Sequence, residues 1–385
     1  MLHARINICI IVLLSCLSSG HAWAQQQSPE ESLQPYHVTV QNDEDINSII
    51  KHQVIESHNF FGLSSYYNSL RYLLITPTSV RSIDLEQEVE LAENEWLAAI
   101  GRFNVFLMQT PQSRIMFSEQ SISIINWPDG ISNKAYVLSK NNLRILPQRF
   151  NEIRYSHLWS PFAFLARFAE ASLDFIYKNV VSHWGWAVVF FAIAIKIVLF
   201  PVGIMTTRLQ REISKVQAVL APEISHIKAH YRGEEAHNLI LEAYKKYGVS
   251  PFYTLKPLLV SFLQVPILVA VFNALGEMPQ FTGSSFLWIT DLAYPDRVFL
   301  LPWQMPMFGD SFNVLPFVMS FVALFSTIIF QNQYAPTTEV KQQKRNLYLM
   351  VLVFFVLFYP FPAVMVLYWA LANILQTVQQ QIIKI

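Results

Sequence analysis

The sequence is poor in glycine, which accounts for 11 of its 385 residues, and it contains only two cysteines. Neither a GxxxxGKS/T nor a GxGxxG pattern is present, which argues against a glycine-rich nucleotide-binding loop. Basic and acidic residues number 27 each, so a net charge of zero gives no general attraction to nucleic acid. Charged residues make up only 14% of the chain, whereas 53% is hydrophobic. This composition indicates a membrane protein and not a soluble domain.

Both cysteines, Cys9 and Cys16, lie in an N-terminal segment with an apolar run from Ile6 to Leu17. Ala22–Ala24 fits the small-x-small pattern that precedes a signal-peptidase site. We therefore predict that residues 1–24 are a secretory signal peptide. Cleavage at this point would leave a mature chain without cysteine, and hence without a disulfide. The alternatives are an uncleaved anchor helix and a lipoprotein signal in which Cys16 is acylated.

Residues 25–154 have an ordinary polar composition without any apolar run of membrane length. The stretches YLLITP and KAYVLSK have the character of strands, and Asp84–Leu107 has the apolar spacing of a helix with an acidic start. We expect a small extracytoplasmic α+β domain here. Its histidines lack the spacing of metal ligands, so the sequence predicts no metal site, and no residue of this part suggests catalysis.

Residues 155–180 combine large apolar side chains with charged ones at helical spacing. Apolar residues such as Trp159 and Phe168 are interspersed with charged residues such as Arg167 and Glu170. This pattern predicts an amphipathic helix that lies at the membrane surface before the chain enters the bilayer. An ordinary helix packed on the preceding domain is the alternative.

Five apolar segments of membrane length follow within residues 184–385. The loop from Thr206 to Lys256 carries eight lysines and arginines and that from Gln331 to Asn346 carries three, whereas Glu277–Phe312 carries only Arg297. Because basic loops remain in the cytoplasm, we expect the N-terminal domain outside and the C-terminus inside. The predicted spans are Trp184–Met205, Leu255–Leu275, Asn313–Phe330, Leu347–Tyr359 (short, and expected to start a turn earlier) and Phe361–Ile383.

The first basic loop has structure of its own. Two stretches inside residues 206–254 have helical periodicity and are separated by Arg232 and Gly233. We expect them to form a cytoplasmic helical hairpin. Its charged faces are either simply solvated or are the surface that meets a partner such as the ribosome.

The first predicted span contains a charged residue, Lys196, in the stretch AIAIKIVLFP. It follows Trp184 by about 18 Å along a helix, which places it near the middle of a bilayer. A lone cation at that depth costs about 3 kcal/mol. No aspartate or glutamate lies within the five spans, so no intramembrane ion pair neutralises it. The unpaired lysine therefore predicts a water-filled groove, and it predicts that another molecule brings the missing anion into this groove.

Other polar residues of the spans are candidates for lining the same groove. Gln264 precedes Pro266, whose ring leaves a backbone carbonyl of the second span free. Ordinary hydrogen bonds between helices are the alternative use of such residues. Besides Lys196, the candidates are Gln264, Ser320, Thr327, Tyr368, Trp369, Asn373 and Gln376.

Several motifs resemble the YidC family of membrane protein insertases, within the YidC/Oxa/Alb superfamily. They are FPAVMVLYWALANILQTVQQQII in the last span, FLWITDLAYPD in the outer loop, YAPTT in the second basic loop and PLLVSFLQVPI in the second span. Their order and the topology agree with that family from Trp184 to the C-terminus. The resemblance implies five helices around a hydrophilic groove, in which one cation on the first helix attracts the acidic flank of a nascent protein.

The resemblance assigns that role to Lys196, at a position where the family usually has arginine. Lysine keeps the charge but loses the planar guanidinium fork. The stretch SPFYTLKP also lacks the glycine pair expected before the second span. The N-terminal domain is shorter than the large β-sandwich of Gram-negative relatives, and the chain stops at Ile385 without a basic tail.

Together these features predict an α-helical polytopic protein of the bacterial inner membrane, with a five-helix core, a cytoplasmic hairpin and a small extracytoplasmic domain. We expect it to move hydrophobic segments of new proteins into the bilayer, as an insertase or chaperone and not as an enzyme, without cofactor. The expected partners are nascent membrane proteins, lipid, the ribosome and the Sec translocon, with no direct contact to nucleic acid. The alternatives are a small-anion transporter or channel and an intramembrane hydrolase.

Overall fold

The computed structural model describes residues 32–85, 87–125, 127, 134–250, 252, 262, 264–329 and 337–383. The predicted signal peptide, the start of the second predicted span and part of the second basic loop lie outside these residues. The chain divides into two compact units. The first comprises Met1–Asn59, Ser65–Leu158 and Glu277–Pro279, and the second comprises Phe60–Ser64, Trp159–Gly276 and Gln280–Ile385.

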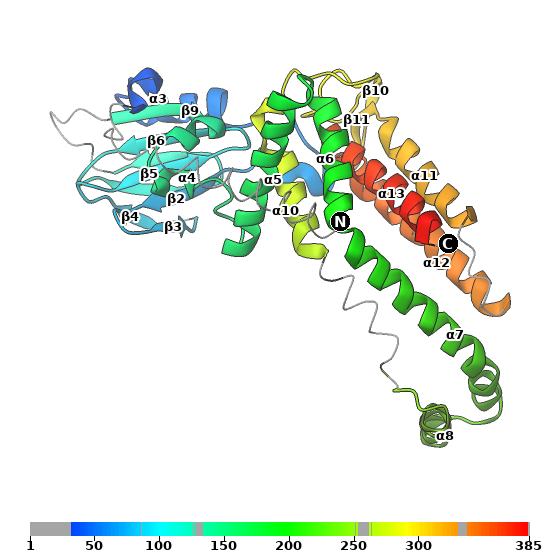
Figure 1. Cartoon of the computed structure of the whole chain (residues 1–385). Coiled ribbons are helices and arrows are strands. Elements are labelled where there is room, and N and C mark those ends of the chain that lie inside the picture. Colours follow the sequence, from blue (N-terminus) through cyan, green and yellow to red (C-terminus); the bar gives the residue numbers. More distant parts are fainter. Residues whose placement is uncertain are drawn as a thin grey trace, which may run out of the picture. The chain divides into compact units, whose positions relative to one another are not determined.

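The first unit is built around a six-stranded antiparallel sheet with the strand order β1-β9-β6-β5-β2-β3 (Figure 1). A second sheet of three antiparallel strands has the order β4-β7-β8. The strands are β1 His37–Val38, β2 Arg71–Ile75, β3 Val80–Ile83, β4 Glu88–Glu90, β5 Trp96–Ile100, β6 Asn104–Gln109, β7 Arg114–Phe117, β8 Ile122–Ile124 and β9 Lys134–Ser139. The helical segments are α3 Asp43–Ile49 with a π-helical turn at Ile50–Val54, α4 Gln148–Asn151, and 3₁₀ turns at Gln34–Tyr36, Gly62–Asn68 and Lys140–Ile145.

Both faces of the large sheet are covered, so its central strands are buried throughout. One face packs against α3 and the small sheet, through residues such as Ile46 and Phe117. The other face packs against the 3₁₀ turn at Lys140–Ile145 and α4, through residues such as Leu143 and Phe150. Burial on both sides explains why β5 reads as an unbroken apolar run instead of alternating with polar residues.

The predicted strands in YLLITP and KAYVLSK are confirmed as β2 and β9. The predicted helix over Asp84–Leu107 is wrong, because this stretch forms β4, β5 and most of β6. A continuous buried run has no periodicity that separates a strand from a buried helix, and the tertiary contacts decide. The turn between β5 and β6 begins at Gly101, where an added Cβ would lie 2.0 Å from the carbonyl oxygen of Val54.

The second unit consists mainly of helices. Its last helix, α13, packs against α6, α7 and α11, and α11 also packs against α12 (Figure 1). The helices are α5 Ser160–Asn179, α6 Trp184–Val198, α7 Phe200–His230, α8 Gly233–Lys246, α10 Val265–Glu277, α11 Leu315–Ile329, α12 Thr337–Phe358 and α13 Ala363–Ile383, with a 3₁₀ turn at Pro279–Phe281. A hairpin of β10 Phe299–Met305 and β11 Gly309–Phe312 precedes α11.

The helices differ from the predicted spans at two places. The first predicted span is not one helix, because α6 ends at Val198 and α7 continues after a bend of 57°. Pro201 stands in the first turn of α7, where its missing N–H is tolerated, and it cannot continue the hydrogen bonding of α6. The helix of the fourth predicted span, α12, begins at Thr337, ten residues before the predicted start at Leu347 and not one turn before it.

In the described part of the chain, no single helix is both long and apolar enough to cross a membrane. The bent pair Trp184–Val198 and Phe200–Ile213 has sufficient length and apolar composition when its two helices are taken together. Shorter apolar helices occur at Val265–Glu277 and Leu315–Ser326.

The stretch predicted as an amphipathic surface helix forms α5. Its aromatic residues Phe164 and Phe175 are exposed, as a lipid-facing side requires. Two of its charged residues, Glu170 and Asp174, are buried instead of lying on an outer polar face. The helix is thus present, and its position at a membrane surface stays a prediction.

Candidate substrate groove

Lys196 lies in the last turn of α6, and its side chain is half-buried. Its Nζ donates a hydrogen bond of 2.6 Å to the side-chain oxygen Oε1 of Gln376 on α13. Across the described ranges, Lys196 forms no ion pair with a carboxylate. The cation is therefore held by a neutral amide, which satisfies one of its three donors and leaves its charge uncompensated.

A second glutamine of α13 secures the other side of the bend. Gln379 is buried, and its Nε2 donates to the backbone oxygen of Phe200 at 3.3 Å. The approach depends on Gly203 of α7, because a Cβ there would lie 1.9 Å from Nε2 of Gln379. Since Gln376 and Gln379 are three residues apart, they share one face of α13 and hold the end of α6 and the start of α7 together.

Asn373 lies one helical turn before Gln376. Its side chain is half-buried and has no hydrogen-bond partner in the portion of the chain that the structure covers. Its backbone oxygen accepts a bond of 2.8 Å from the hydroxyl of Thr377. The amide of Asn373 is thus available to water or to a substrate close to the Lys196–Gln376 pair.

Tyr368 and Trp369, also predicted to line the groove, pack among aromatic rings. The ring of Tyr368 lies 6.3 Å from that of Phe191 on α6 and 6.1 Å from that of Phe272 on α10. Trp369 contacts Phe272 together with two rings of α12, Phe354 at 5.2 Å and Phe358 at 5.1 Å. The two residues bind α10, α12 and α13 together, and their contact with a substrate stays a prediction.

Gln264 immediately precedes α10 and is half-buried. Its backbone oxygen accepts from the N–H of Leu268 at 3.0 Å, in the first turn of that helix. Gln264 and Lys196 form no hydrogen bond with each other within the described ranges. Most of the chain just before it lies outside those ranges, so its place in the groove also stays a prediction.

The remaining polar candidates of the groove lie on α11. The hydroxyls of Ser326 and Thr377 are 2.5 Å apart and join α11 to α13. Ser320 is different, because its Oγ is buried and finds no partner among the residues that the structure describes. The side chain of Thr327 lies outside those residues. An unsatisfied hydroxyl inside a helical bundle is costly unless water reaches it, which favours a hydrated interior.

The first unit contains a charged cluster that the sequence pattern did not reveal. Glu277 is buried, and its carboxylate accepts from Lys140 Nζ at 2.7 Å and from Arg71 at 3.1 Å. Burial raises the pKa of Glu277, but the charges of Arg71, Lys140 and His157 outweigh it and lower the pKa to about 2. Burial lowers the pKa of Lys140 to about 8, against the opposing effect of Glu277. The pair is therefore ionised at neutral pH.

A cation set among apolar helices, bonded to the one amide of Gln376 and to no described carboxylate, marks a candidate functional site in integral membrane proteins. The described residues contain no group of three or more histidines, cysteines or acids that could hold a metal ion.

The chain belongs to the 60Kd inner membrane protein family, whose model matches residues 175–385. This match confirms the family resemblance inferred from the motifs. Curated relatives named membrane protein insertase YidC include that of Herminiimonas arsenicoxydans, 30% identical over 208 residues, which are 54% of this chain and 34% of the relative. That of Chlorobaculum parvum is 26% identical over 358 residues, 86% of this chain and 57% of the relative. That of Wolinella succinogenes is 26% identical over 302 residues, 75% and 51%. The chain thus spans between about a third and somewhat over half of the length of these relatives.

Proposed function

We propose that this protein is a membrane protein insertase, which moves hydrophobic segments of newly made proteins from the cytoplasm into the bilayer. The observation that carries the proposal is Lys196, a half-buried cation whose partner is the amide of Gln376. The names of the relatives support the same activity. It requires no nucleotide, no cofactor and no chemical step from this chain.

The proposed topology follows the positive-inside rule. Residues 25–154 form an extracytoplasmic domain, 155–180 an interfacial helix and 184–385 a five-span core, with the hairpin of residues 206–254 in the cytoplasm. Ile227 of α7 packs against Ala236 and Ala243 of α8, and Lys246 pairs with Glu223 at 3.0 Å. This hairpin is well placed to receive a nascent chain, with the ribosome or the Sec translocon as further partners.

Insertion begins when the polar flank of a nascent segment enters the groove. Water around Lys196, Gln376 and Asn373 solvates that flank and shortens the apolar barrier it has to cross. An acidic flank also gains attraction to the ammonium of Lys196, about 1 to 4 kcal/mol at 4 Å between aqueous and intermediate dielectric. The hydrophobic segment then moves sideways into lipid, driven by the transfer of about 20 apolar residues out of water.

The test is insertion of a short single-span protein with an acidic flank into liposomes that contain the purified chain. We expect Lys196→Ala to slow insertion and Lys196→Arg to retain it, because arginine keeps the charge. Lys51→Ala, which removes an exposed cation from the first unit, is the matched control and should insert normally. Equal insertion by all variants would rule out attraction by Lys196, and no insertion by the unaltered chain would leave only a chaperone role.

A further inference from the structure

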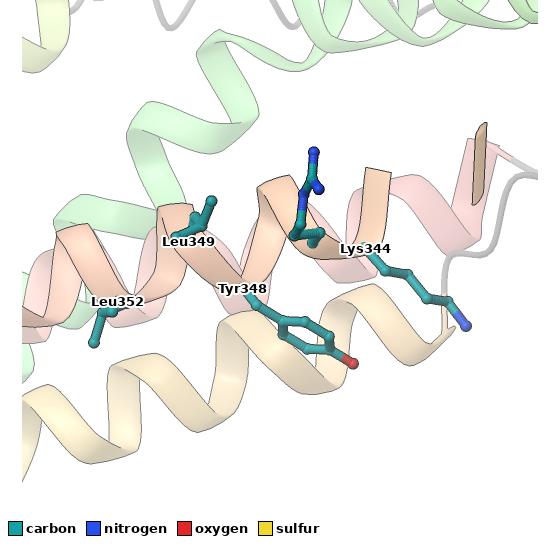
Figure 2. Close-up of a pocket in the computed structure, with 5 residues that line it drawn as sticks. Lys344, Tyr348, Leu349 and Leu352 are labelled. Atoms are coloured by element: carbon teal, nitrogen blue, oxygen red, sulfur yellow. The ribbon is translucent and has the colours of Figure 1, made fainter. Parts of the chain in front are cut away.

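A second charged site lies on α12, outside the proposed groove. A hollow of about 450 Å³ is lined by Lys344, Arg345, Tyr348, Leu349 and Leu352. Figure 2 shows Lys344 and Tyr348 extending side by side toward the start of the helix, with Leu349 on the opposite edge. The lining therefore has two cations at one end and three large apolar side chains along the rest.

The two cations pair with none of the acidic side chains that the structure describes. Neither Lys344 nor Arg345 has an ion-pair partner in the described portion of the chain. No acidic residue occurs between Lys344 and the end of α12 at Phe358. A ligand with a negative group would complement this end of the hollow.

The apolar part of the lining is more than half exposed. Tyr348, Leu349 and Leu352 are 56%, 54% and 58% exposed, although each is large and apolar. Leu352 lies about 12 Å along the helix axis from Lys344, at the rise of an α-helix. A ligand that fits both halves has an anionic head and a hydrocarbon tail that runs along the helix for at least this distance.

We propose that this hollow binds an anionic glycerophospholipid from the cytoplasmic leaflet. The phosphate lies at the Lys344–Arg345 end of the hollow, and an acyl chain follows Tyr348, Leu349 and Leu352. The proposal rests on the proposed function in one respect, since it requires the start of α12 to lie at the cytoplasmic face of the membrane. Basic residues directly beside an apolar helical surface are the usual protein side of such lipid recognition.

The strength of the head-group contact can be expressed as a binding ratio. A lysine or arginine near the surface favours an anionic lipid about fivefold, so the two cations together favour it about 25-fold. The test is native mass spectrometry of the full chain in detergent, titrated with dioleoylphosphatidylglycerol or dioleoylphosphatidylcholine. We expect Lys344→Gln/Arg345→Gln to weaken the first phosphatidylglycerol bound about 25-fold and to leave phosphatidylcholine binding unchanged.

Lys228→Gln/Lys245→Gln is the matched control, because it removes two exposed cations from α7 and α8. It should retain phosphatidylglycerol as the unaltered chain does. Equal weakening in both double variants would overturn the proposal in favour of general surface charge. Unchanged binding in Lys344→Gln/Arg345→Gln would also overturn it, provided that its melting temperature is normal.

Glycerol phosphate, which has the anionic head without acyl chains, distinguishes a lipid site from an anion site. It should fail to displace phosphatidylglycerol at equal concentration, and displacement would overturn the proposal. The readout needs no insertion substrate, so failure here leaves the insertase proposal intact. Conversely, Lys196→Ala should bind phosphatidylglycerol normally even if it inserts nothing.

Discussion

Replacing Gln376 by glutamate would turn the amide partner of Lys196 into a carboxylate of nearly the same shape. The ammonium and the nearest side-chain oxygen are 2.6 Å apart. At that distance and an effective dielectric constant of 20, the attraction amounts to about 6 kcal/mol, before the cost of removing the carboxylate from water. We therefore expect the variant to fold with at least normal thermal stability. The new carboxylate should neutralise the charge of Lys196 in the groove.

The consequence for insertion follows from the same charges. The proposed attraction of Lys196 for an acidic flank, about 1 to 4 kcal/mol, disappears when the cation is already paired. Since 1.4 kcal/mol corresponds to a factor of ten, the initial insertion rate should fall at least about fivefold. The assay compares a substrate with an aspartate flank and one with an asparagine flank, and only the first should be slowed.

The control is Gln381→Glu, which adds the same charge to an exposed position of α13. It should insert both substrates at the normal rate. If Gln376→Glu inserts the aspartate-flanked substrate as fast as the unaltered chain does, the ammonium of Lys196 does not attract the substrate. The groove would then act by hydration alone.

Two further predictions concern the stability of the first unit. Because the pKa of Glu277 is about 2 when folded and higher when unfolded, its contribution of about 3 kcal/mol is complete above pH 4.5 and is lost as the pH falls toward 2. Glu277→Gln should flatten the dependence of melting temperature on pH in that window, and an unchanged slope would contradict the assignment. Gly101→Ala should lower the free energy of unfolding by about 2 to 3 kcal/mol in urea titrations, since its Cβ meets a backbone oxygen that cannot rotate away. A change below about 0.5 kcal/mol would show that the turn adjusts freely.

The sequence was informative where local pattern and tertiary structure agree. Apolar helices within residues 184–385 and the strands β2 and β9 follow directly from their residue types. The helix predicted at Asp84–Leu107 failed because β5 and β6 are covered on both faces, which removes the alternation that marks a strand. Only pairing with β2 and β9, which are distant in the sequence, fixes these residues as strands.

The sequence singled out both Lys196 and Gln376 as groove candidates, but it did not reveal that they contact each other. Lys196 was conspicuous because a charge in an apolar run has no ordinary structural explanation. The contact between Gly203 and Gln379 joins residues far apart in the chain and could not be seen in either neighbourhood alone. The break between α6 and α7 did have a signal, Pro201, which marks a helix start as readily as a kink.

The choice of an amide as the partner of Lys196 follows from two opposing requirements. A carboxylate on α13 would stabilise the ammonium best, but it would cancel the field by which, in the proposed mechanism, Lys196 attracts an incoming acidic flank. An apolar residue would leave the field intact, but it would leave the buried end of the cation without any acceptor, at a cost of several kcal/mol. The Oε1 atom of Gln376 offers a strong acceptor and carries no net charge. Of the three kinds of partner, only the amide gives the ammonium a hydrogen-bond acceptor and also leaves its charge uncancelled for the proposed attraction.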